Sequence, residues 1–454
     1  MRRWLAGAGL GAVGGLGLMV PELRQAQVGA ALDGADTAWM LTATALVLLM
    51  TPGLSFFYAG MVRLKNVVST LLQSFMAMAV ISVLWVLVGF SLSFGDSFHG
   101  LIGDPRTFAF FRGVGVQTHP ALAPTIPLLL FALFQLKFAI ITPALITGAF
   151  AERVRFKAYL LFMVLFSLFI YAPLAHWTWH PEGFLRQWGV LDFAGGTVVH
   201  MSAGFAALAG ALVLGKRHAA PPTHAPANLP FVLLGTGMLW FGWFGFNAGS
   251  ALAANGTAAL AFATTNTASA AAMLGWMTFD WMRGRKPSAL GACTGAVVGL
   301  VAITPAAGFV TVGHSLVVGL VASFVSHTAV HLKSRTGIDD TLDVFPCHGL
   351  GGVVGMVLTG VLAKDVGLLS GNPRTFLMHL LALGLVSAFS LGGSYLLYRL
   401  VDRLVPLRVT RTEELEGLDL SQHGESAAEV YSGPLAAEPT APANTPAGPL
   451  PSLA

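Results

Sequence analysis

A succession of long apolar segments constrains this chain more than any other feature of its sequence. About eleven of them lie between residues 36 and 401, and each is near the ~20 residues that a helix needs to cross a bilayer. In lipid the backbone must satisfy its own hydrogen bonds, which only helices and closed barrels achieve. The alternation of apolar and polar residues that a barrel requires is absent. The sequence therefore predicts an all-α polytopic membrane protein with about 11 transmembrane helices.

The composition of the 454 residues agrees with this prediction. Hydrophobic residues make up 55% of the chain and charged residues 10%, whereas a soluble domain has about 25% charged residues. The net charge of +4 does not indicate a nucleic-acid partner, because the cations lie in short loops. Cys293 and Cys347 both lie in apolar spans and indicate neither a disulfide framework nor a metal cluster. We expect no cofactor. The predicted spans are 36–61, 66–93, 123–149, 158–179, 191–215, 230–252, 257–282, 289–307, 311–332, 341–363 and 375–401.

Four parts of the chain differ in character. Residues 1–30 combine Arg2 and Arg3 with an apolar core and a small-residue site at Val28-Gly29-Ala30, which favours a cleaved signal peptide over an uncleaved extra helix. Residues 31–405 form the predicted transmembrane domain. Residues 406–431 are charged and are expected to form a cytoplasmic regulatory tail. Residues 432–454 are rich in Pro and Ala, and we expect them to be disordered.

Cations in alternate loops predict the orientation of the spans. The loops rich in Lys and Arg hold Arg63 and Lys65; Arg153, Arg155 and Lys157; Lys216 and Arg217; Arg283, Arg285 and Lys286; and Lys333 and Arg335. The positive-inside rule therefore places the mature N-terminus outside and the C-terminus in the cytoplasm. The odd number of spans predicts two inverted repeats of five helices plus one extra helix, related by a pseudo-two-fold axis in the membrane plane.

Two of the spans contain a histidine among glycines. One reads Asp192-Phe-Ala-Gly-Gly-Thr-Val-Val-His200, and the other reads Asp343-Val-Phe-Pro-Cys-His348-Gly. An ionisable residue within the bilayer is costly unless it faces a cavity or a partner. In an inverted repeat both histidines would meet near the midplane, where transporters place their sites. Packed structural histidines and haem ligands of a membrane oxidoreductase are the alternatives.

Several longer motifs, in order along the chain, carry a specific resemblance. These are the two histidine segments, the run from Phe134 to Arg153, Ala175-His-Trp-Thr-Trp179, and Gly242-Trp-Phe-Gly-Phe246-Asn-Ala-Gly-Ser250. The chain resembles the ammonium transporter family (Amt/Mep/Rh), in its bacterial Amt type, through all the spans and into the tail. The resemblance implies a transporter and not an enzyme, assembled as a homotrimer with one pore in each subunit.

The resemblance also implies roles for particular residues. An outer recruitment site for ammonium would consist of Phe134, Trp179 and Ser250, because aromatic faces attract a cation and a hydroxyl oxygen accepts a hydrogen bond. A gate of stacked rings would consist of Phe138 and Phe246. The pore would be lined by His200 and His348, past which ammonia crosses, with or without a separate proton. Asp192 would assist proton release or give structural support by capping its helix.

Three further expectations concern residues beside this path. Asp343 is expected to cap or brace its helix. Lys137 lies between Phe134 and Phe138, and we expect it to face a subunit interface or an acidic partner, because a cation in the pore would repel ammonium. The segment from Glu413 to Glu425 resembles the family's cytoplasmic tail motif, which implies a PII-type signal protein as a partner. An ammonium sensor of the same fold, with little conduction, is the main alternative function.

Overall fold

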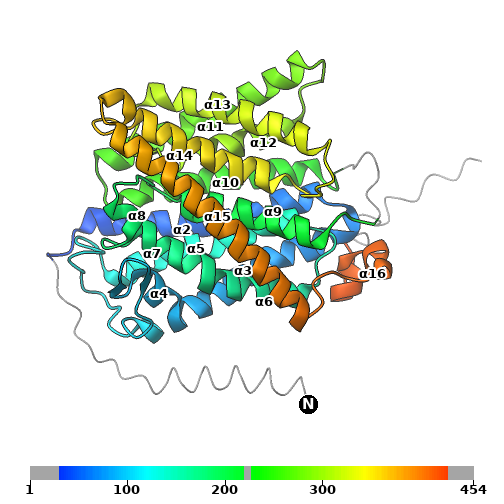
Figure 1. The fold of residues 1–454 in the computed structure, drawn as a ribbon, viewed down its shortest axis with the longest axis horizontal. Helices are drawn as coiled ribbons and strands as arrows, with labels where there is room; N and C mark the ends of the chain where they lie inside the picture. The colour runs from blue at the N-terminus through cyan, green and yellow to red at the C-terminus, as the bar shows by residue number, and fades with distance from the viewer. Residues whose placement is uncertain (1–29, 219–225, 428–454) are drawn as a thin grey trace, which may run out of the picture.

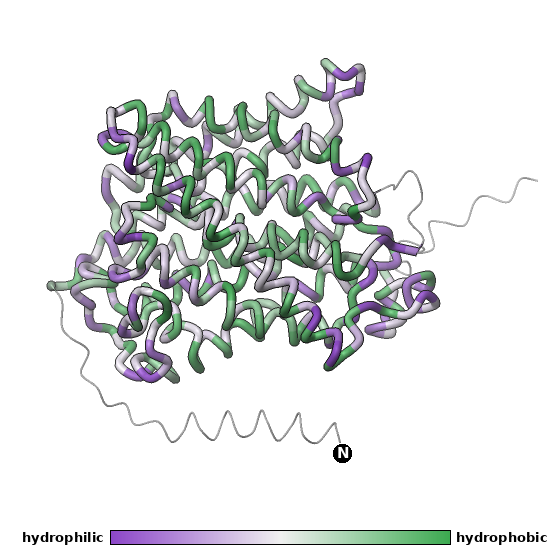
Figure 2. The backbone as a smooth tube through the Cα atoms, in the orientation of Figure 1, coloured by the Kyte–Doolittle hydropathy of each residue, from purple (hydrophilic) through white to green (hydrophobic). Residues whose placement is uncertain are grey.

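The computed structural model of the protein describes residues 30–218 and 226–427. Nearly all of the predicted signal peptide, the end of the tail and the predicted disordered segment lie outside these residues. Within them the chain forms a bundle of long helices whose axes run roughly the same way (Figure 1). Figure 2 shows that hydrophobic residues fill the length of the bundle while hydrophilic residues gather at its two ends.

The first half of the bundle contains five long helical segments. They are α2 (Gly34–Met61); α3 (Val67–Leu84), continued by η2 (Trp85–Gly89) and α4 (Phe90–Phe94); α5 (Leu128–Ile146), ending in η4 (Thr147–Ala149); α6 (Phe156–Phe166), continued by η5 (Ser167–Tyr171) and α7 (Ala172–Trp179); and η6 (Gly196–Met201) with α9 (Ser202–Leu214). Shorter elements connect them: η1 (Leu64–Asn66), η3 (Ala109–Phe111), α8 (Phe184–Gln187) and the antiparallel pair β1 (Ser97–Phe98) and β2 (Ile102–Gly103).

The second half repeats this number of segments. They are α10 (Leu229–Ala248), ending in η7 (Gly249–Ala251); α11 (Gly256–Met282); α12 (Ala289–Ile303); α13 (Val312–Lys333); and η8 (Phe345–Gly349) with α14 (Leu350–Leu362). After η9 (Leu368–Ser370), the extra helix α15 (Pro373–Leu404) runs obliquely across the bundle (Figure 1), and α16 (Arg411–Glu416) and η10 (Asp419–His423) follow it.

Each predicted span contains a helix, so the predicted fold class is confirmed. By length and hydropathy, 9 helices in the described part of the chain can cross a membrane, and α12 is a shorter apolar helix. The helix α11, with 27 residues, is long enough to cross but is not among the nine. Prolines explain two differences in the ends. The third span begins at Leu128 rather than residue 123, with Pro127 as its N-cap. The span predicted at 289–307 ends at Ile303, because Pro305 has no N–H group to continue the helical hydrogen bonds.

The packing of the two halves is reciprocal, as an inverted repeat requires. The first helices of the halves, α2 and α10, pack along each other, while α9 packs on η8 and α14 packs on η6. The helix α15 contacts α9 and α14 and therefore spans both halves. This arrangement brings the two histidine-bearing helices together in the interior of the bundle.

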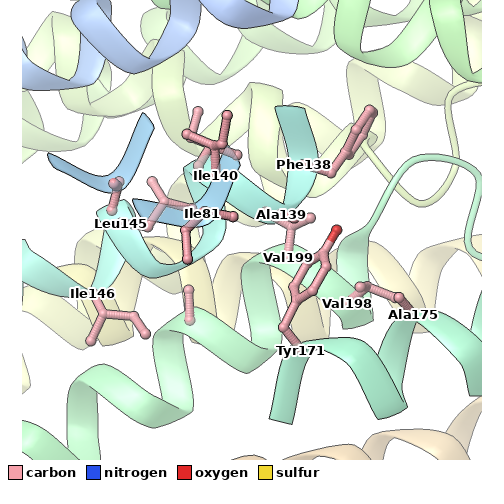
Figure 3. Packing of buried hydrophobic residues seen from close by; sticks show 14 of the residues in the cluster. Ile81, Phe138, Ala139, Ile140, Leu145, Ile146, Tyr171, Ala175, Val198 and Val199 are labelled. Carbon is pink, nitrogen blue, oxygen red and sulfur yellow. The ribbon is translucent and has the colours of Figure 1, made fainter. Parts of the chain in front are cut away.

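A close approach of backbones makes this crossing possible. A Cβ atom on Gly204 would lie 2.1 Å from the backbone nitrogen of Gly349, and one on Gly352 would lie 3.0 Å from the carbonyl oxygen of Gly196. Small residues allow helices in membranes to approach in this way. Beside the crossing, the buried helix α5 carries much of the hydrophobic core, and Figure 3 shows Phe138, Ala139 and Ile140 packed there with residues of neighbouring helices.

We expect Gly204→Ala to destabilise the protein by about 3 kcal/mol or more, because overpacking in a tight interior costs about 1–3 kcal/mol and here the added carbon meets immobile backbone. Gly237→Ala on α10 is the matched control, since its Cβ would meet nothing within 4 Å. Thermal unfolding in detergent measures both. Equal melting temperatures for the two variants would contradict the tight crossing.

Candidate functional site

The carboxylate of Asp192 binds the start of the helix that carries His200. Its Oδ1 accepts hydrogen bonds from the amides of Gly195 and Gly196 at 2.8 and 2.7 Å. Its Oδ2 accepts bonds from the amide and hydroxyl of Thr197 at 2.7 and 2.5 Å. These donors include amides that a helix start leaves without intrahelical partners. Of the two roles expected for Asp192, the contacts directly support capping.

Asp340 caps the other histidine helix, and the sequence analysis missed it. Its carboxylate accepts hydrogen bonds from the amides of Val344 and Phe345 at 3.1 and 2.8 Å. Asp343, which we expected to cap or brace this helix, instead has φ of 58° and pairs with Lys333 at 2.5 Å, a bracing contact.

A shared spacing could have identified Asp340 from sequence. Asp192 precedes His200 by the same eight positions that separate Asp340 from His348. Both histidines also lie in short π-helical segments, η6 and η8, that start the two helices. Capping carboxylate, π-helical turn and histidine therefore recur as one unit in each half of the inverted repeat.

The side chains of His200 and His348 meet where these helices cross. Their Nδ1 atoms are 3.3 Å apart and their ring centroids 5.4 Å apart, and both side chains are buried. An Nδ1–Nδ1 hydrogen bond requires one nitrogen to donate and the other to accept. The neutral pair therefore holds a single proton between the rings. The Nε2 of His200 has no hydrogen-bond partner within the described residues.

An unbroken series of rings leads to this pair. Trp179 contacts Phe138 with centroids 5.6 Å apart, and Phe138 contacts Phe246 at 4.2 Å with an interplanar angle of 33°. Phe246 in turn lies 6.0 Å from the ring of His200. Phe138 and Phe246 are both fully buried. The structure thus brings together the two residues expected to form a gate and places them between Trp179 and the histidines.

Three cavities follow the same series. A cavity of about 590 Å³, here named the aromatic vestibule, is lined by residues that include Phe138, Trp179, Asp192 and Ser250. A narrow cavity beyond Phe246 is lined by both histidines, by the rings of Trp243, Phe246 and Phe57, and by aliphatic side chains, and it leaves only about 10 Å³ for a water-sized molecule. A cavity of about 170 Å³, here named the tail-side vestibule, is lined by residues that include His348, Asp343 and Arg217.

Two of the predicted recruitment residues line the aromatic vestibule, and the third does not. The hydroxyl of Ser250 donates to the carbonyl oxygen of Phe246 at 2.9 Å, so its own oxygen is available as an acceptor. The indole of Trp179 donates to the backbone carbonyl of Asp192 at 3.2 Å. Phe134 is fully buried behind the wall, where its ring packs on Phe138 with centroids 4.9 Å apart. It therefore supports Phe138 rather than facing the cavity.

Lys137 is a half-buried residue on α5 that lines none of these three cavities. This placement agrees with the expectation that it points away from the pore. Among residues 30–218 and 226–427 of a single chain, the ammonium group of Lys137 has neither an ion pair nor a hydrogen bond. The expected acidic partner is therefore not among these residues. Among the same residues, no cluster of His, Cys, Asp and Glu could hold a metal ion.

The tail packs on the loops at the end of the bundle that holds the tail-side vestibule. Asp419 accepts hydrogen bonds from the amides of Val68 and Ser69 at 3.1 and 2.8 Å, at the start of α3. The buried Glu414 accepts a hydrogen bond from the amide of His218 at 2.6 Å and pairs with Arg408 at 2.8 Å. These contacts tie the tail to the α9–α10 loop, whose Arg217 lines the tail-side vestibule.

The fold and this line of cavities define a polytopic membrane protein with a narrow, ring-lined conduit. The family model described as the Ammonium Transporter Family matches residues 38–428. An ammonium transporter of Aquifex aeolicus is 47% identical over 406 residues, which cover 88% of this chain and 94% of that protein. An ammonium transporter of Bacillus subtilis is 45% identical over 400 residues, which cover 86% and 98%. The chain therefore belongs to the ammonium transporter family, a family of membrane transporters rather than enzymes.

Solved structures agree with this assignment. The crystal structure of Mep2 from Candida albicans has a TM-score of 0.81 and 36% identity and covers 92% of this chain and 94% of its own. A structure described as a sensor Amt protein has a TM-score of 0.79 and 30% identity and covers 86% and 98%. The resemblance seen in the sequence motifs is thus confirmed for the family and for the fold.

We expect Asp340→Ala to lower stability by about 1–2 kcal/mol, because the start of η8 loses both of its carboxylate bonds and N-cap removal costs about that much. Asp192→Ala is expected to cost at least as much, since four hydrogen bonds are lost. Glu416→Ala, at an exposed residue of the tail, is the control and should leave the melting temperature unchanged. A melting temperature for Asp340→Ala equal to that control would refute the capping role.

Proposed function

We propose that the protein recruits ammonium in the aromatic vestibule, removes its proton near the Phe138–Phe246 gate, and passes ammonia through the narrow cavity beside His200 and His348. The observation that carries this proposal is the contact of the two imidazoles in a buried, otherwise apolar cavity. Transport of ammonium is the property that the family assigns; the sequence of steps is our inference from the geometry.

The aromatic vestibule offers the groups that a small cation needs. The ring faces of Trp179 and Phe138 attract a cation through their quadrupoles, an interaction worth about 0.5–2 kcal/mol depending on how far it is desolvated. Ser250 supplies a hydroxyl oxygen, because its proton is engaged by the carbonyl of Phe246. Ammonium donates four directed hydrogen bonds and potassium donates none. A site of π faces and acceptors therefore favours ammonium.

The gate and the narrow cavity favour the neutral molecule. A charged group within the bilayer costs at least about 2.5–3.5 kcal/mol, and the narrow cavity has room for about one water-sized molecule. Ammonia is neutral and of that size. The histidine pair gives it polar neighbours, since a neutral imidazole donates at one nitrogen and accepts at the other. The proton left behind has the same pair of rings available as a route.

The experiment that tests this proposal measures ammonium-evoked current on a solid-supported membrane that carries proteoliposomes. We expect His200→Ala with His348→Ala to abolish the wild-type current, because an apolar cavity gives neither ammonia nor a proton a partner. Wild-type current with unchanged selectivity over potassium and methylammonium would end the proposal.

The gate makes a separate prediction about exclusion. We expect Phe246→Ala to admit potassium, because removal of the ring joins the aromatic vestibule to the narrow cavity and lets a hydrated ion enter. Phe244→Ala on the same helix is the matched control, since Phe244 packs on Phe262 with centroids 3.9 Å apart and away from the gate. Potassium current through the control, or none through Phe246→Ala, would contradict the gate.

An ammonium sensor is the second candidate function, and a specific likeness favours it. The solved structure described as a sensor Amt protein has the same fold, and the docked tail of this chain contacts the loop that lines the tail-side vestibule. A sensor would bind ammonium and alter the exposure of its tail while carrying little current. Limited proteolysis of the tail with and without ammonium, beside the current measurement, separates the two functions.

The proposal includes an assembly and an orientation. We infer a homotrimer with the aromatic vestibule outside and the tail-side vestibule in the cytoplasm of the cell inner membrane, where a PII-type signal protein would bind the tail and neighbouring loops. The half-buried Lys137 supports an assembly, because a second copy would supply the partner that one chain lacks. Native mass spectrometry is expected to give a trimer, and a monomer would refute the assembly. Cysteine labelling from either side of the membrane tests the orientation.

A further inference from the structure

Two polar side chains in the aromatic vestibule have no partner. The Oε1 atom of Gln135 and the Oγ1 atom of Thr178 are buried and lack any hydrogen bond within the described part of the chain. The two residues are 9% and 4% exposed, and both line the vestibule together with Trp179, Phe138 and Ser250. A buried polar atom without a partner costs about 1–3 kcal/mol. Such atoms in a native protein call for a ligand, an ion or a water.

The position of Gln135 mirrors that of Ser250. Gln135 precedes Phe138 by three residues on α5, and Ser250 follows Phe246 by four residues at the end of α10. Residues three or four apart lie on the same face of a helix, one turn from each other. Each of the two gate phenylalanines therefore has one polar side chain on the same helix face, one turn away from it. Thr178 adds a third oxygen from α7, beside Trp179.

The chemistry of these groups matches a cation that donates hydrogen bonds. The amide of Gln135 can turn either its oxygen or its NH₂ group toward the cavity, and a cation selects the oxygen. The hydroxyl of Thr178 accepts through its lone pairs in the same way. Ammonium needs several acceptors at once, and Ser250 supplies only one.

We propose that Gln135 and Thr178 supply the remaining hydrogen-bond acceptors for recruited ammonium and so determine its preference over methylammonium. This inference rests on the proposed function. Ammonium has four N–H donors and methylammonium has three. The oxygens of Ser250, Gln135 and Thr178 accept three of them and an adjacent ring face accepts the fourth, so only ammonium uses every partner in the site. Removal of an acceptor weakens ammonium binding more than methylammonium binding, and the ratio of the two affinities falls.

The test uses the full chain in proteoliposomes with the variants Gln135→Leu and Thr178→Val, which keep the approximate size of each side chain. A hydrogen bond to a charged group is worth about a tenfold or larger change in affinity. We expect the ammonium concentration that gives half-maximal current to rise about tenfold or more in Gln135→Leu, with the saturating current retained. We expect the ammonium-to-methylammonium affinity ratio to fall in both variants.

Gln73 provides the matched control. It is also a buried glutamine whose Oε1 lacks a partner, but it lies on α3 and lines neither vestibule nor the narrow cavity. Gln73→Leu should leave the half-maximal concentration and the affinity ratio unchanged. Neither leucine variant removes a hydrogen bond within the described protein, so we expect melting temperatures at or above that of the wild type. A merely structural role for Gln135 would lower stability without moving the ratio.

Two results would overturn the inference. One is an unchanged half-maximal concentration and ratio in Gln135→Leu, which would mean that only water occupies these groups. The other is a weaker ammonium affinity in Gln135→Glu, since glutamate keeps an acceptor oxygen and adds a favourable charge. Gln135→Glu also tests the inference if Gln135→Leu does not fold. Trp179→Ala separates the two levels of the argument. If both Trp179→Ala and Gln135→Leu leave the ammonium affinity unchanged, the proposed recruitment site itself is wrong. If Trp179→Ala changes the affinity and Gln135→Leu does not, only the roles of Gln135 and Thr178 are rejected.

Discussion

The rest of the structure depends on the contact between two imidazoles at the crossing of two helices. His200 and His348 reach hydrogen-bonding distance only because the backbones of η8 and α9 approach each other at Gly204 and Gly349. A single methyl group at that point would force the helices apart and separate the rings. Close packing of glycines, and not the histidines themselves, is therefore what makes a buried polar pair possible in a bundle that is otherwise apolar.

The same crossing explains why two carboxylates lie so deep in the protein. A helix that starts inside a bundle leaves its first amides without intrahelical partners, and in lipid there is no water to satisfy them. Asp192 and Asp340 supply the missing acceptors from opposite ends of the bundle. A negative charge at a helix N-terminus also interacts favourably with the positive end of the helix dipole. Each half of the repeat thus uses one carboxylate to begin a helix and one histidine to meet the other half.

The aromatic series and the cavities complete a gradient of polarity along the bundle. The aromatic vestibule contains charged groups, hydroxyls and ring faces, whereas the polar groups of the narrow cavity are two imidazoles and an indole among aliphatic and phenylalanine side chains. Under the proposed function, a cation is accommodated at one end and excluded from the middle. On the other side, Arg217 and the buried Glu414 link the tail-side vestibule to the docked tail, which places a charged, exposed segment beside the end of the conduit.

The sequence by itself determined the class of fold and the approximate ends of the spans, because hydrophobic length and intramembrane ionisable residues are local properties that lipid makes costly to violate. It also singled out Phe138, Phe246, His200 and His348, whose neighbours form long motifs. Only the tertiary structure decided that Phe134 stands behind the wall, that Asp340 rather than Asp343 caps the second helix, and that Gln135 and Thr178 lack partners. These properties depend on which surfaces of distant helices meet, and a sequence read one segment at a time does not contain that distance information.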